Sequence, residues 1–401
     1  MRRKTMPNKS YERKPKEKIP VLAICYDFDR TLSPDDMQAQ GFIQAVGYDD
    51  PKDFWNKTNS CAAENDMDQN LSWMYQMMLL SEGKVLFTKN ELTAYGAGVH
   101  LFSGVDSWFD RINRYGEENK VKVEHYVISS GLKEMIEGTP IAQKFEKIYA
   151  SSFFYNENGV AKWPAQVVNY TNKTQFLFRI EKGVLDVNDP RVNDYFTPED
   201  VRVPFRNIVY IGDSVTDVPC MKLVNSLGGH SIGVYNPNGE NKEQICEMLD
   251  NHRIKYFVPA DYTRHSELEL LIKNIILKTV TNELLEDKFV KCKNEAQQIL
   301  NKSLEEKQKE ESKKNKLIYS LMTSPSYAMT HTIISQLSPI KEWNDDQREL
   351  ICNAANNPQV GYVLMDDDVH KFYKKIVSGT SATTECIEQV RKSLGLKTTS
   401  K

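Results

Sequence analysis

The sequence predicts an α/β protein, in which a parallel sheet carries an inserted helical segment and is followed by an all-α C-terminal extension. Three apolar runs predict the central strands, at 21–26, 121–128 and 208–211, because buried parallel strands are short, continuous apolar segments. Each run is followed by polar side chains of the kinds that bind ligands or take part in catalysis. About a hundred residues with helical periodicity separate the first run from the second, which predicts an inserted helical domain.

Composition is typical of a soluble globular protein with two or three domains. The chain has 401 residues, of which 40% are hydrophobic and 27% charged, and its net charge is −3. This balance gives no attraction to nucleic acid or membrane, so we expect neither partner. Seven cysteines without a Cys-x-x-Cys pair favour reduced thiols in the cytoplasm over disulfides or a zinc site. No apolar run approaches the ~20 residues that span a bilayer.

The N-terminal segment, residues 1–19, predicts a basic and disordered tail. Its first eighteen residues hold eight basic and two acidic side chains, and they lack the apolar segment of a signal peptide. An anchor for RNA or for an acidic surface is the alternative interpretation.

Two carboxylates two residues apart, Asp27 and Asp29, follow the first predicted strand. Ligands bind at this end of the strands in an open parallel sheet. Two close carboxylates at a buried strand end repel each other, and a hard divalent cation such as Mg²⁺ would compensate. An acidic surface turn is the alternative.

Helical patterns fill the segment between the first two strands. Met and aromatic residues recur through 71–80, including Trp73 and Met77. Such a cluster usually forms the core of a helix pair, and a substrate-facing apolar wall is the alternative.

The second strand leads into Ser129, Ser130 and Gly131. Small hydroxyl residues and Gly before a helix form a phosphate-binding turn at its N-terminus, although an ordinary Ser-capped turn has the same pattern. A hairpin with an Asn-Gly turn is predicted over 145–160. Lys173 then lies near a helix start, where a lysine is unfavourable for the helix dipole and indicates a nearby anion. A plain surface lysine is the alternative.

The third strand ends in Gly212-Asp213, with Asp217 in the first turn of the next helix. Gly permits a sharp turn, and it brings Asp213 to the same sheet edge as Asp27 and Asp29. Further strands are predicted near 231–235 and 255–259.

The character of the sequence changes at residue 266. We expect a long exposed helix and a charged linker over 266–316, with the linker at 302–316, and a small helical domain over 317–401. The acidic run 366–368 fits a helix N-terminus better than a metal site. Residues 266–401 are the part in which we expect self-association or a protein partner.

Taken in order, these motifs resemble the haloacid-dehalogenase-like (HAD) superfamily of phosphotransferases. Asp27-Phe-Asp-Arg-Thr-Leu32 is similar to its first motif, Ser129 to its second, Lys173 to its third, and the run 212–217 to its fourth. The resemblance covers residues 20–265 and is closest to phosphoserine-phosphatase-like members. It implies a Rossmann-like sheet with a helical cap of the C1 type inserted at about 34–112.

The resemblance implies a Mg²⁺-dependent phosphomonoester hydrolase that works in the cytoplasm on a small phosphorylated metabolite. By this likeness Asp27 attacks phosphorus to form an aspartyl-phosphate, and Asp29 acts as proton donor and acceptor. Mg²⁺ would be held by the Asp27 carboxylate, the Asp29 backbone carbonyl and Asp213, with Asp217 bound directly or through water.

The phosphate clamp implied by the resemblance consists of Ser129, Ser130, Gly131 and a lysine. Lys173 is the first candidate for this lysine, and Lys182 is the second. Arg30 departs from the family pattern, where a small residue is common.

Two other classes of protein fit part of the pattern. A catalytically weak HAD-like sensor or adaptor would use its C-terminal helical region to bind a partner protein. A receiver-type domain also gathers acidic residues and a lysine at strand ends, but it would lack the inserted cap.

Overall fold

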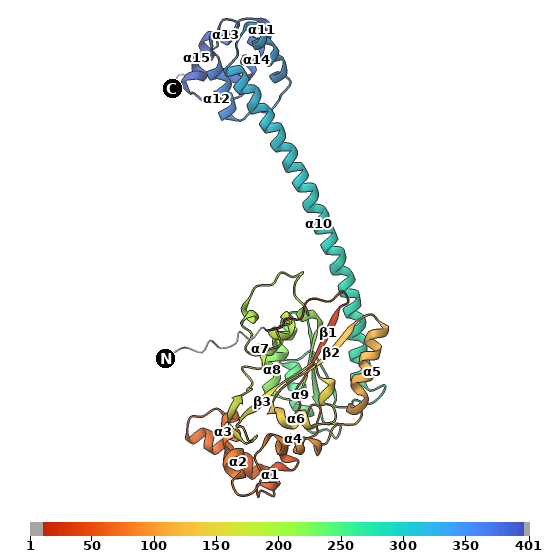
Figure 1. The fold of residues 1–401 in the computed structure, drawn as a ribbon. Coiled ribbons are helices and arrows are strands. Elements are labelled where there is room, and N and C mark those ends of the chain that lie inside the picture. The colour runs from red at the N-terminus through yellow and green to blue at the C-terminus, as the bar shows by residue number, and fades with distance from the viewer. Residues whose placement is uncertain (1–10, 397–401) are drawn as a thin grey trace, which may run out of the picture. The chain divides into compact units, whose positions relative to one another are not determined.

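The structure is a computed structural model that describes residues 11–396 (Figure 1). Residues 1–10 and 397–401 lie outside the described part, and so does the first half of the predicted basic tail. The chain forms two compact units, Met1–Asp287 and Lys288–Lys401, which we describe one at a time.

A seven-stranded sheet forms the centre of the first unit, with the strand order β4-β3-β2-β1-β5-β6-β7. The strands are β1 (Val21–Tyr26), β2 (Lys122–Leu132), β3 (Lys147–Tyr155), β4 (Ala161–Gln166), β5 (Ile208–Gly212), β6 (His230–Tyr235) and β7 (Tyr256–Pro259). Neighbours pair in parallel, except that β3 and β4 form the predicted antiparallel hairpin. The predicted α/β fold class, a mostly parallel sheet with an inserted helical segment and an all-α C-terminal extension, is confirmed.

The register places the carboxyl ends of the three central strands side by side. Tyr26 of β1 is level with Val127 of β2 and with Ile211 of β5. The residues that follow these positions therefore emerge together at one edge of the sheet, which is the ligand-binding edge of parallel sheets.

Strand β1 is buried along its whole length because helices cover both faces of the sheet. Alternate side chains point to opposite faces, so Leu22 and Ile24 join one core cluster while Val21 and Ala23 join the other. Helix α5 (Val105–Glu118) and the first turns of α10 (Glu267–Met322) cover the first face. Helices α7 (Thr174–Lys182), α8 (Val218–Ser226) and α9 (Lys242–Asp250) cover the second (Figure 1).

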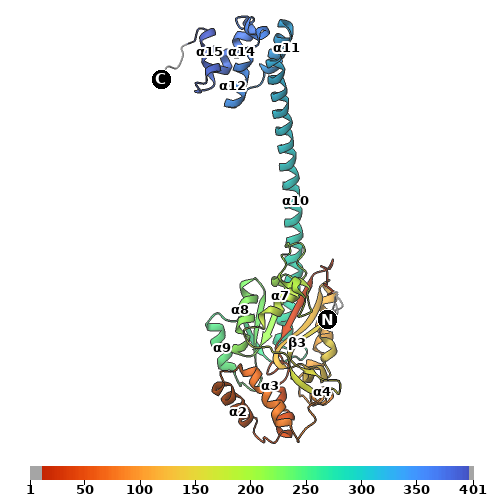
Figure 2. The same cartoon turned by 60° about the vertical axis from the view of Figure 1, so that its left-hand side comes forward.

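Helices are inserted between β1 and α5, beyond the ligand-binding edge of the sheet (Figure 2). They are α1 (Phe42–Ala45), α2 (Pro51–Glu64), α3 (Gln69–Ser81) and α4 (Lys89–Ala97). We expected the insertion over 34–112, but α5 packs on the sheet, where Trp108 donates a hydrogen bond of 2.8 Å to the Tyr26 hydroxyl. The inserted cap therefore ends before Val105. Its presence distinguishes this fold from a receiver-type domain.

The described part of the N-terminal segment, residues 11–19, is bound to the first unit and differs from the expected disordered tail. The backbone of Lys14 donates a hydrogen bond of 2.9 Å to Gly183. Glu17 pairs with the fully buried guanidinium of Arg202, which also pairs with Glu124 of β2 at 2.7 Å. A buried cation needs such partners, so Glu17 is part of the folded unit.

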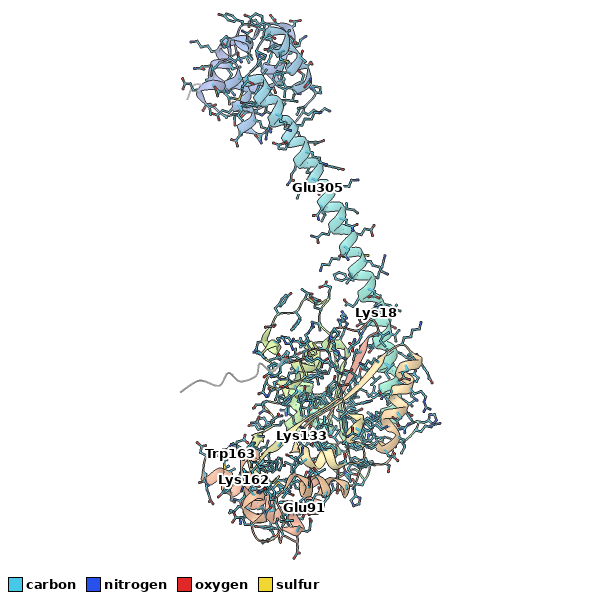
Figure 3. All side chains as sticks on the ribbon, viewed as in Figure 1. Lys18, Glu91, Lys133, Lys162, Trp163 and Glu305 are labelled. Carbon is cyan, nitrogen blue, oxygen red and sulfur yellow. The ribbon has the colours of Figure 1, made fainter. Side chains whose placement is uncertain are left out.

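The sheet edge at β4 carries features that prevent further strand pairing. Lys162 and Trp163 lie on this strand (Figure 3), and Trp163 is 71% exposed. Pro164 follows and has no backbone N–H to offer a further strand.

Helix α10 (Glu267–Met322) is longer than expected. We predicted a charged linker at 302–316, but this segment is helical because Lys, Glu and Gln are strong helix formers. The second unit gathers the end of α10 with α11 (Tyr327–Leu337), α12 (Asp345–Ala354), α13 (Pro358–Gly361), α14 (Asp367–Ser378) and α15 (Glu385–Ser393) around its own core. Residues 366–368 begin α14, as predicted.

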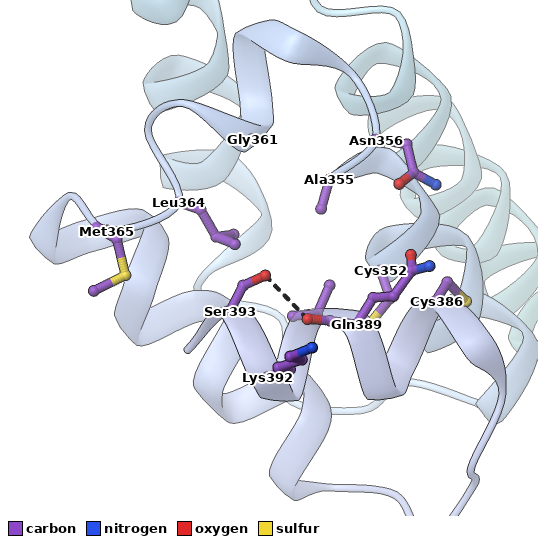
Figure 4. A pocket seen from close by; sticks show the side chains of 11 residues that line it. Cys352, Ala355, Asn356, Gly361, Leu364, Met365, Cys386, Gln389, Lys392 and Ser393 are labelled. Atoms are coloured by element: carbon purple, nitrogen blue, oxygen red, sulfur yellow. Dashed lines mark hydrogen bonds between the residues drawn. The ribbon is translucent and has the colours of Figure 1, made fainter. Parts of the chain in front are cut away.

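A cavity of about 400 Å³ lies in the second unit, between α12 and α15 (Figure 4). Cys352, Leu364 and Cys386 are among the side chains that line it. None of the candidate site residues predicted from the sequence lines this cavity. Within the described residues, no helix is long and apolar enough to cross a membrane.

Candidate active site

Three carboxylates meet at the ligand-binding edge of the sheet. Asp27 follows β1, Asp213 follows β5, and Asp217 lies one turn further on; one oxygen from each lies within 4.8 Å of the others. Their residues are only 7%, 5% and 0% exposed. Within the described part of the chain, this is the one such group of potential metal ligands.

The charges of this carboxylate trio are only partly compensated. Burial, opposed by Lys173 and reinforced by the charge of Asp217, raises the pKa of Asp27 to about 6. Burial, together with the charges of Asp217 and Asp27, also raises the pKa of Asp213 well above its usual range. Buried oxygen ligands with unmet negative charge are the environment in which a hard divalent cation binds, so the residues present fit Mg²⁺.

Lys173 is the cation within the site. It stands at the start of α7 and is fully buried, with Nζ 2.8 Å from Asp217 Oδ1 and 3.2 Å from Asp27 Oδ1. Burial alone would lower the pKa of this ammonium group, but Asp217 and Asp27 raise it above its ordinary value. Lys173 therefore stays protonated, and the surface-lysine interpretation is wrong.

Asp217 is held as the partner of Lys173. Its Oδ1 accepts hydrogen bonds of 2.8 Å from both Lys173 and the Tyr210 hydroxyl. The carboxylate packs against Gly212 so closely that any Cβ at position 212 would overlap it. Only Asp217 Oδ2 remains for a metal ion or its water, so direct coordination by Asp217 stays a prediction.

Asp29 points away from the trio. Its Oδ1 accepts a hydrogen bond of 2.9 Å from the Met37 backbone, and its Oδ2 lies over Gly131, where a Cβ would come within 2.9 Å. Burial, with the charges of Asp36 and Asp27, raises the pKa of Asp29 well above its usual range. The side chain therefore faces the cap, and a metal contact would come through the Asp29 backbone, as the resemblance implies.

Residues 129–131 do not form the expected turn at a helix N-terminus. Strand β2 continues through Leu132, and the short α6 (Lys133–Gly138) begins only afterwards. The ladder between β2 and β3 shifts register here, which lets the Ser129 Oγ accept a hydrogen bond of 3.1 Å from Gly131 N. The Ser129 hydroxyl also lies near the Asp27 carboxyl, where it weakly opposes the rise in pKa that burial causes.

Lys182, the second candidate for the phosphate-site lysine, is not brought to the site. Its Nζ donates hydrogen bonds of 2.7 and 2.8 Å to the carbonyls of Val192 and Asp194. It lies at the last turn of α7, whereas Lys173 lies at the first.

Arg30 adopts a left-handed backbone conformation with φ of 56°. Such a position favours Gly, which explains why a small residue is common there. The Arg30 guanidinium lies 3.4 Å from Asp36 and 4.0 Å from Asp35. Arg30 therefore neutralises the acidic start of the cap.

A cavity of about 240 Å³ opens between Asp29 and the cap. Sequence reasoning missed most of its lining, because those residues come from separate cap segments. The lining comprises Asp29, Asp36, Gln38, Trp55, Thr58, Asn59, Gln69, Asn70, Trp73, Ser130 and Gly131. Core and cap residues thus line one open cavity beside Asp29, the candidate proton donor.

The comparisons with known proteins identify HAD-type hydrolases among similar structures, and no family model matches the chain. An uncharacterized protein of Borreliella burgdorferi is 27% identical over 280 residues, covering 63% of this chain and 95% of that relative. A HAD family hydrolase from Salmonella enterica serovar Typhi has a TM-score of 0.41 and 17% identity, covering 64% of this chain and 72% of the hydrolase. A probable phosphoserine phosphatase from Vibrio cholerae has a TM-score of 0.41 and 13% identity, covering 67% and 68%. With such TM-scores, we argue function from the site alone.

Proposed function

We propose that this protein is a Mg²⁺-dependent phosphomonoester hydrolase that works through an aspartyl-phosphate. The observation that carries the proposal is the arrangement around Asp27. Its carboxylate lies 3.2 Å from the buried Lys173 and shares a cluster with Asp213, while Asp29 faces a separate cavity. This arrangement offers a nucleophile beside a cation site, with a candidate proton donor two residues further along the chain.

The chemistry requires several groups to act together. Phosphate-monoester hydrolysis is among the slowest uncatalysed reactions, and enzymes accelerate it by up to ~10²¹-fold. Positioning and stabilisation of charge supply most of that gain in phosphoryl transfer. Lys173 and the Ser129 hydroxyl are placed to bind phosphoryl oxygens next to Asp27, and a bound Mg²⁺ would neutralise further negative charge there.

The proposed steps use this chain's own carboxylates. An Asp27 oxygen attacks phosphorus, the bond from phosphorus to the alcohol oxygen breaks, and Asp29 donates its proton to that oxygen. Asp29 then accepts a proton from the water that attacks the phosphoryl group, which releases phosphate and restores Asp27. The raised pKa of Asp29 supports this role, because a proton donor must hold its proton near neutral pH.

Replacing Asp29 with Asn is expected to lower kcat on an alkyl phosphate by about 10²–10⁴-fold, the usual contribution of a positioned acid or base. The first step should be spared with p-nitrophenyl phosphate, because nitrophenolate leaves without a proton. Rapid-quench kinetics with both substrates measure this difference. Equal slowing of the first step with both leaving groups would count against Asp29 as the proton donor.

Mg²⁺ is expected to raise the Tm of the wild-type protein, since a ligand at 100 times its Kd adds about 2.7 kcal/mol of stability. Asp213→Asn should reduce this shift strongly. Asp250→Asn, at an exposed position on α9, is the control and should keep it. Thermal unfolding with Mg²⁺ and with EDTA gives the readout independently of activity. An undiminished shift in Asp213→Asn would remove Asp213 from the metal site.

Two further points belong to this proposal. A cytoplasmic setting is supported by the seven cysteines, all free thiols. A small phosphorylated metabolite as substrate is supported by the cap, whose residues line the cavity beside Asp29. Self-association or partner binding through residues 266–401 stays a prediction.

The sensor hypothesis also stays a prediction. It would be favoured if the protein showed no Mg²⁺-dependent turnover of any phosphorylated metabolite.

A further inference from the structure

The walls of the cavity beside Asp29 have a distinctive chemistry. Amides, hydroxyls and two tryptophans make up most of the lining, and the charged members, Asp29 and Asp36, are both acidic. No Lys, Arg or His lines this cavity within the described residues. An uncharged polar ligand matches such walls better than an anionic one.

Gln38 is a buried polar group without a partner. It is 2% exposed, it lines the cavity, and its amide makes no hydrogen bond to the part of the chain that the structure describes. An amide in a cavity wall that bonds to no protein group is available to water or to a ligand oxygen. Gln38 belongs to the short helix η1 (Met37–Ala39), whose first backbone N–H binds Asp29. This helix thus places the Gln38 amide next to the proposed proton donor.

Trp55, on α2, offers the cavity a different kind of surface. It lines the cavity, and its indole Nε1–H is buried without a hydrogen-bond partner among the described residues. Trp73, in contrast, donates to Asn70 Oδ1 at 3.2 Å, and Asn70 donates to the Val168 carbonyl at 2.7 Å. Trp73 and Asn70 are therefore held within the wall by their own hydrogen bonds. The Gln38 amide keeps its donors free for ligand oxygens, whereas the buried Trp55 N–H does not face the cavity, and Trp55 offers it only the surface of its ring.

The acidic groups in the wall have cationic or backbone partners of their own. Asp36 pairs with Arg30 at 3.4 Å, and Asp29 accepts from the Met37 backbone at 2.9 Å. A cationic ligand therefore meets little free negative charge. A ligand carboxylate would find no Lys, Arg or His in the lining to pair with, and burial of an unpaired charge is unfavourable.

The size of the cavity sets a limit on the ligand. Its volume of about 240 Å³ compares with a share of ≈ 30 Å³ for each water molecule in the liquid. This volume is sufficient for a short polyol chain or one sugar ring. The indole faces of the two tryptophans offer apolar contact to the C–H groups of such a chain.

We propose that this cavity binds the alcohol part of a small, uncharged polyhydroxy phosphomonoester, a polyol or sugar phosphate, with Gln38 as a donor to its hydroxyl oxygens. This inference rests on the proposed function and deepens it. The phosphoryl group would lie at Asp27, and the hydroxyl-bearing carbons would extend past Asp29 into the cavity.

The first test compares four small phosphomonoesters with the full chain and Mg²⁺. Glycerol 3-phosphate is expected to exceed 3-phosphoglycerate, n-propyl phosphate and phosphoethanolamine in kcat/KM by at least about tenfold, because a site built to bind hydroxyls rejects analogues that lack them. Equal or better turnover of 3-phosphoglycerate or phosphoethanolamine would overturn the proposal in favour of an anionic or a cationic alcohol.

The second test removes the Gln38 amide. Gln38→Met keeps the length of the side chain, and it should lower the preference for glycerol 3-phosphate over n-propyl phosphate by about tenfold, the loss expected for one or two hydrogen bonds. Gln297→Met, at an exposed position on α10, is the matched control and should keep the preference. Gln38→Ala serves as a second variant if Gln38→Met does not fold. An unchanged preference in a folded Gln38 variant overturns the proposal.

Turnover of p-nitrophenyl phosphate separates the two levels of inference. If the wild-type protein does not hydrolyse this substrate with Mg²⁺, the proposed function fails. If it does, and glycerol 3-phosphate shows no advantage over n-propyl phosphate, the polyol inference alone fails.

Discussion

Asp27→Asn is expected to abolish the turnover of p-nitrophenyl phosphate, with kcat reduced by about 10⁴-fold or more, because an amide cannot replace the carboxylate that attacks phosphorus. Steady-state release of nitrophenolate with Mg²⁺ measures the effect. Asp110→Asn, at an exposed position on α5, is the control and should keep full activity. Turnover near the wild-type level in Asp27→Asn would contradict the mechanism in which Asp27 is the nucleophile.

The same substitution should not unfold the protein. The folded structure raises the pKa of Asp27 to about 6, chiefly through burial. A carboxyl group with a raised pKa weakens the fold as the pH rises through that value, since its charged form is less stable in the folded state. At neutral pH and in EDTA, the Tm of Asp27→Asn is therefore expected to equal or exceed that of the wild type. A lower Tm would mean that the lost activity reflects lost structure.

Lys173→Met is expected to remove activity and also to destabilise the fold. Lys173 is the buried cation between Asp27 and Asp217, and removal of one partner from a buried ion pair costs about 3–5 kcal/mol. Chemical denaturation in EDTA measures the free energy of unfolding, and p-nitrophenyl phosphate measures turnover.

Two further variants give this experiment its controls. Lys182→Met changes a lysine on the same helix that donates to the carbonyls of Val192 and Asp194 and lies over the Phe196 ring, so the activity of this variant should stay within a small factor of wild type. Adding Asp217→Asn to Lys173→Met should restore part of the stability by removing the unpaired carboxylate, but no activity. Full stability of Lys173→Met alone would contradict its placement between the two carboxylates.

The central strands and their chemical ends could be predicted from the sequence because the signal is local. An apolar run ending in Asp27 or in Gly212-Asp213 specifies both the buried strand and the residue that emerges from it. Parallel pairing then brings these ends together, which the register of Tyr26 with Val127 and Ile211 confirms.

The cavity could not be predicted because periodicity reports burial and not what a side chain faces. Met77 is fully buried in the hydrophobic core, whereas Trp73, in the same helix, is 6% exposed and lines the cavity. Gln38 and Trp55 come from different segments, so no spacing in the sequence relates them. The turn expected at 129–131 failed for a similar reason, since the extension of β2 depends on pairing with β3.

The nucleophile can be identified most directly by trapping the phosphorylated enzyme. Asp29→Asn should accept the phosphoryl group from p-nitrophenyl phosphate but lack the base for its hydrolysis. Acid quench after mixing with Mg²⁺, followed by peptide mass spectrometry, is predicted to show one phosphoryl group on Asp27 and a matching burst of nitrophenolate. A burst with the phosphoryl group on Ser129, or turnover without any phosphorylated peptide, would contradict the central role of Asp27.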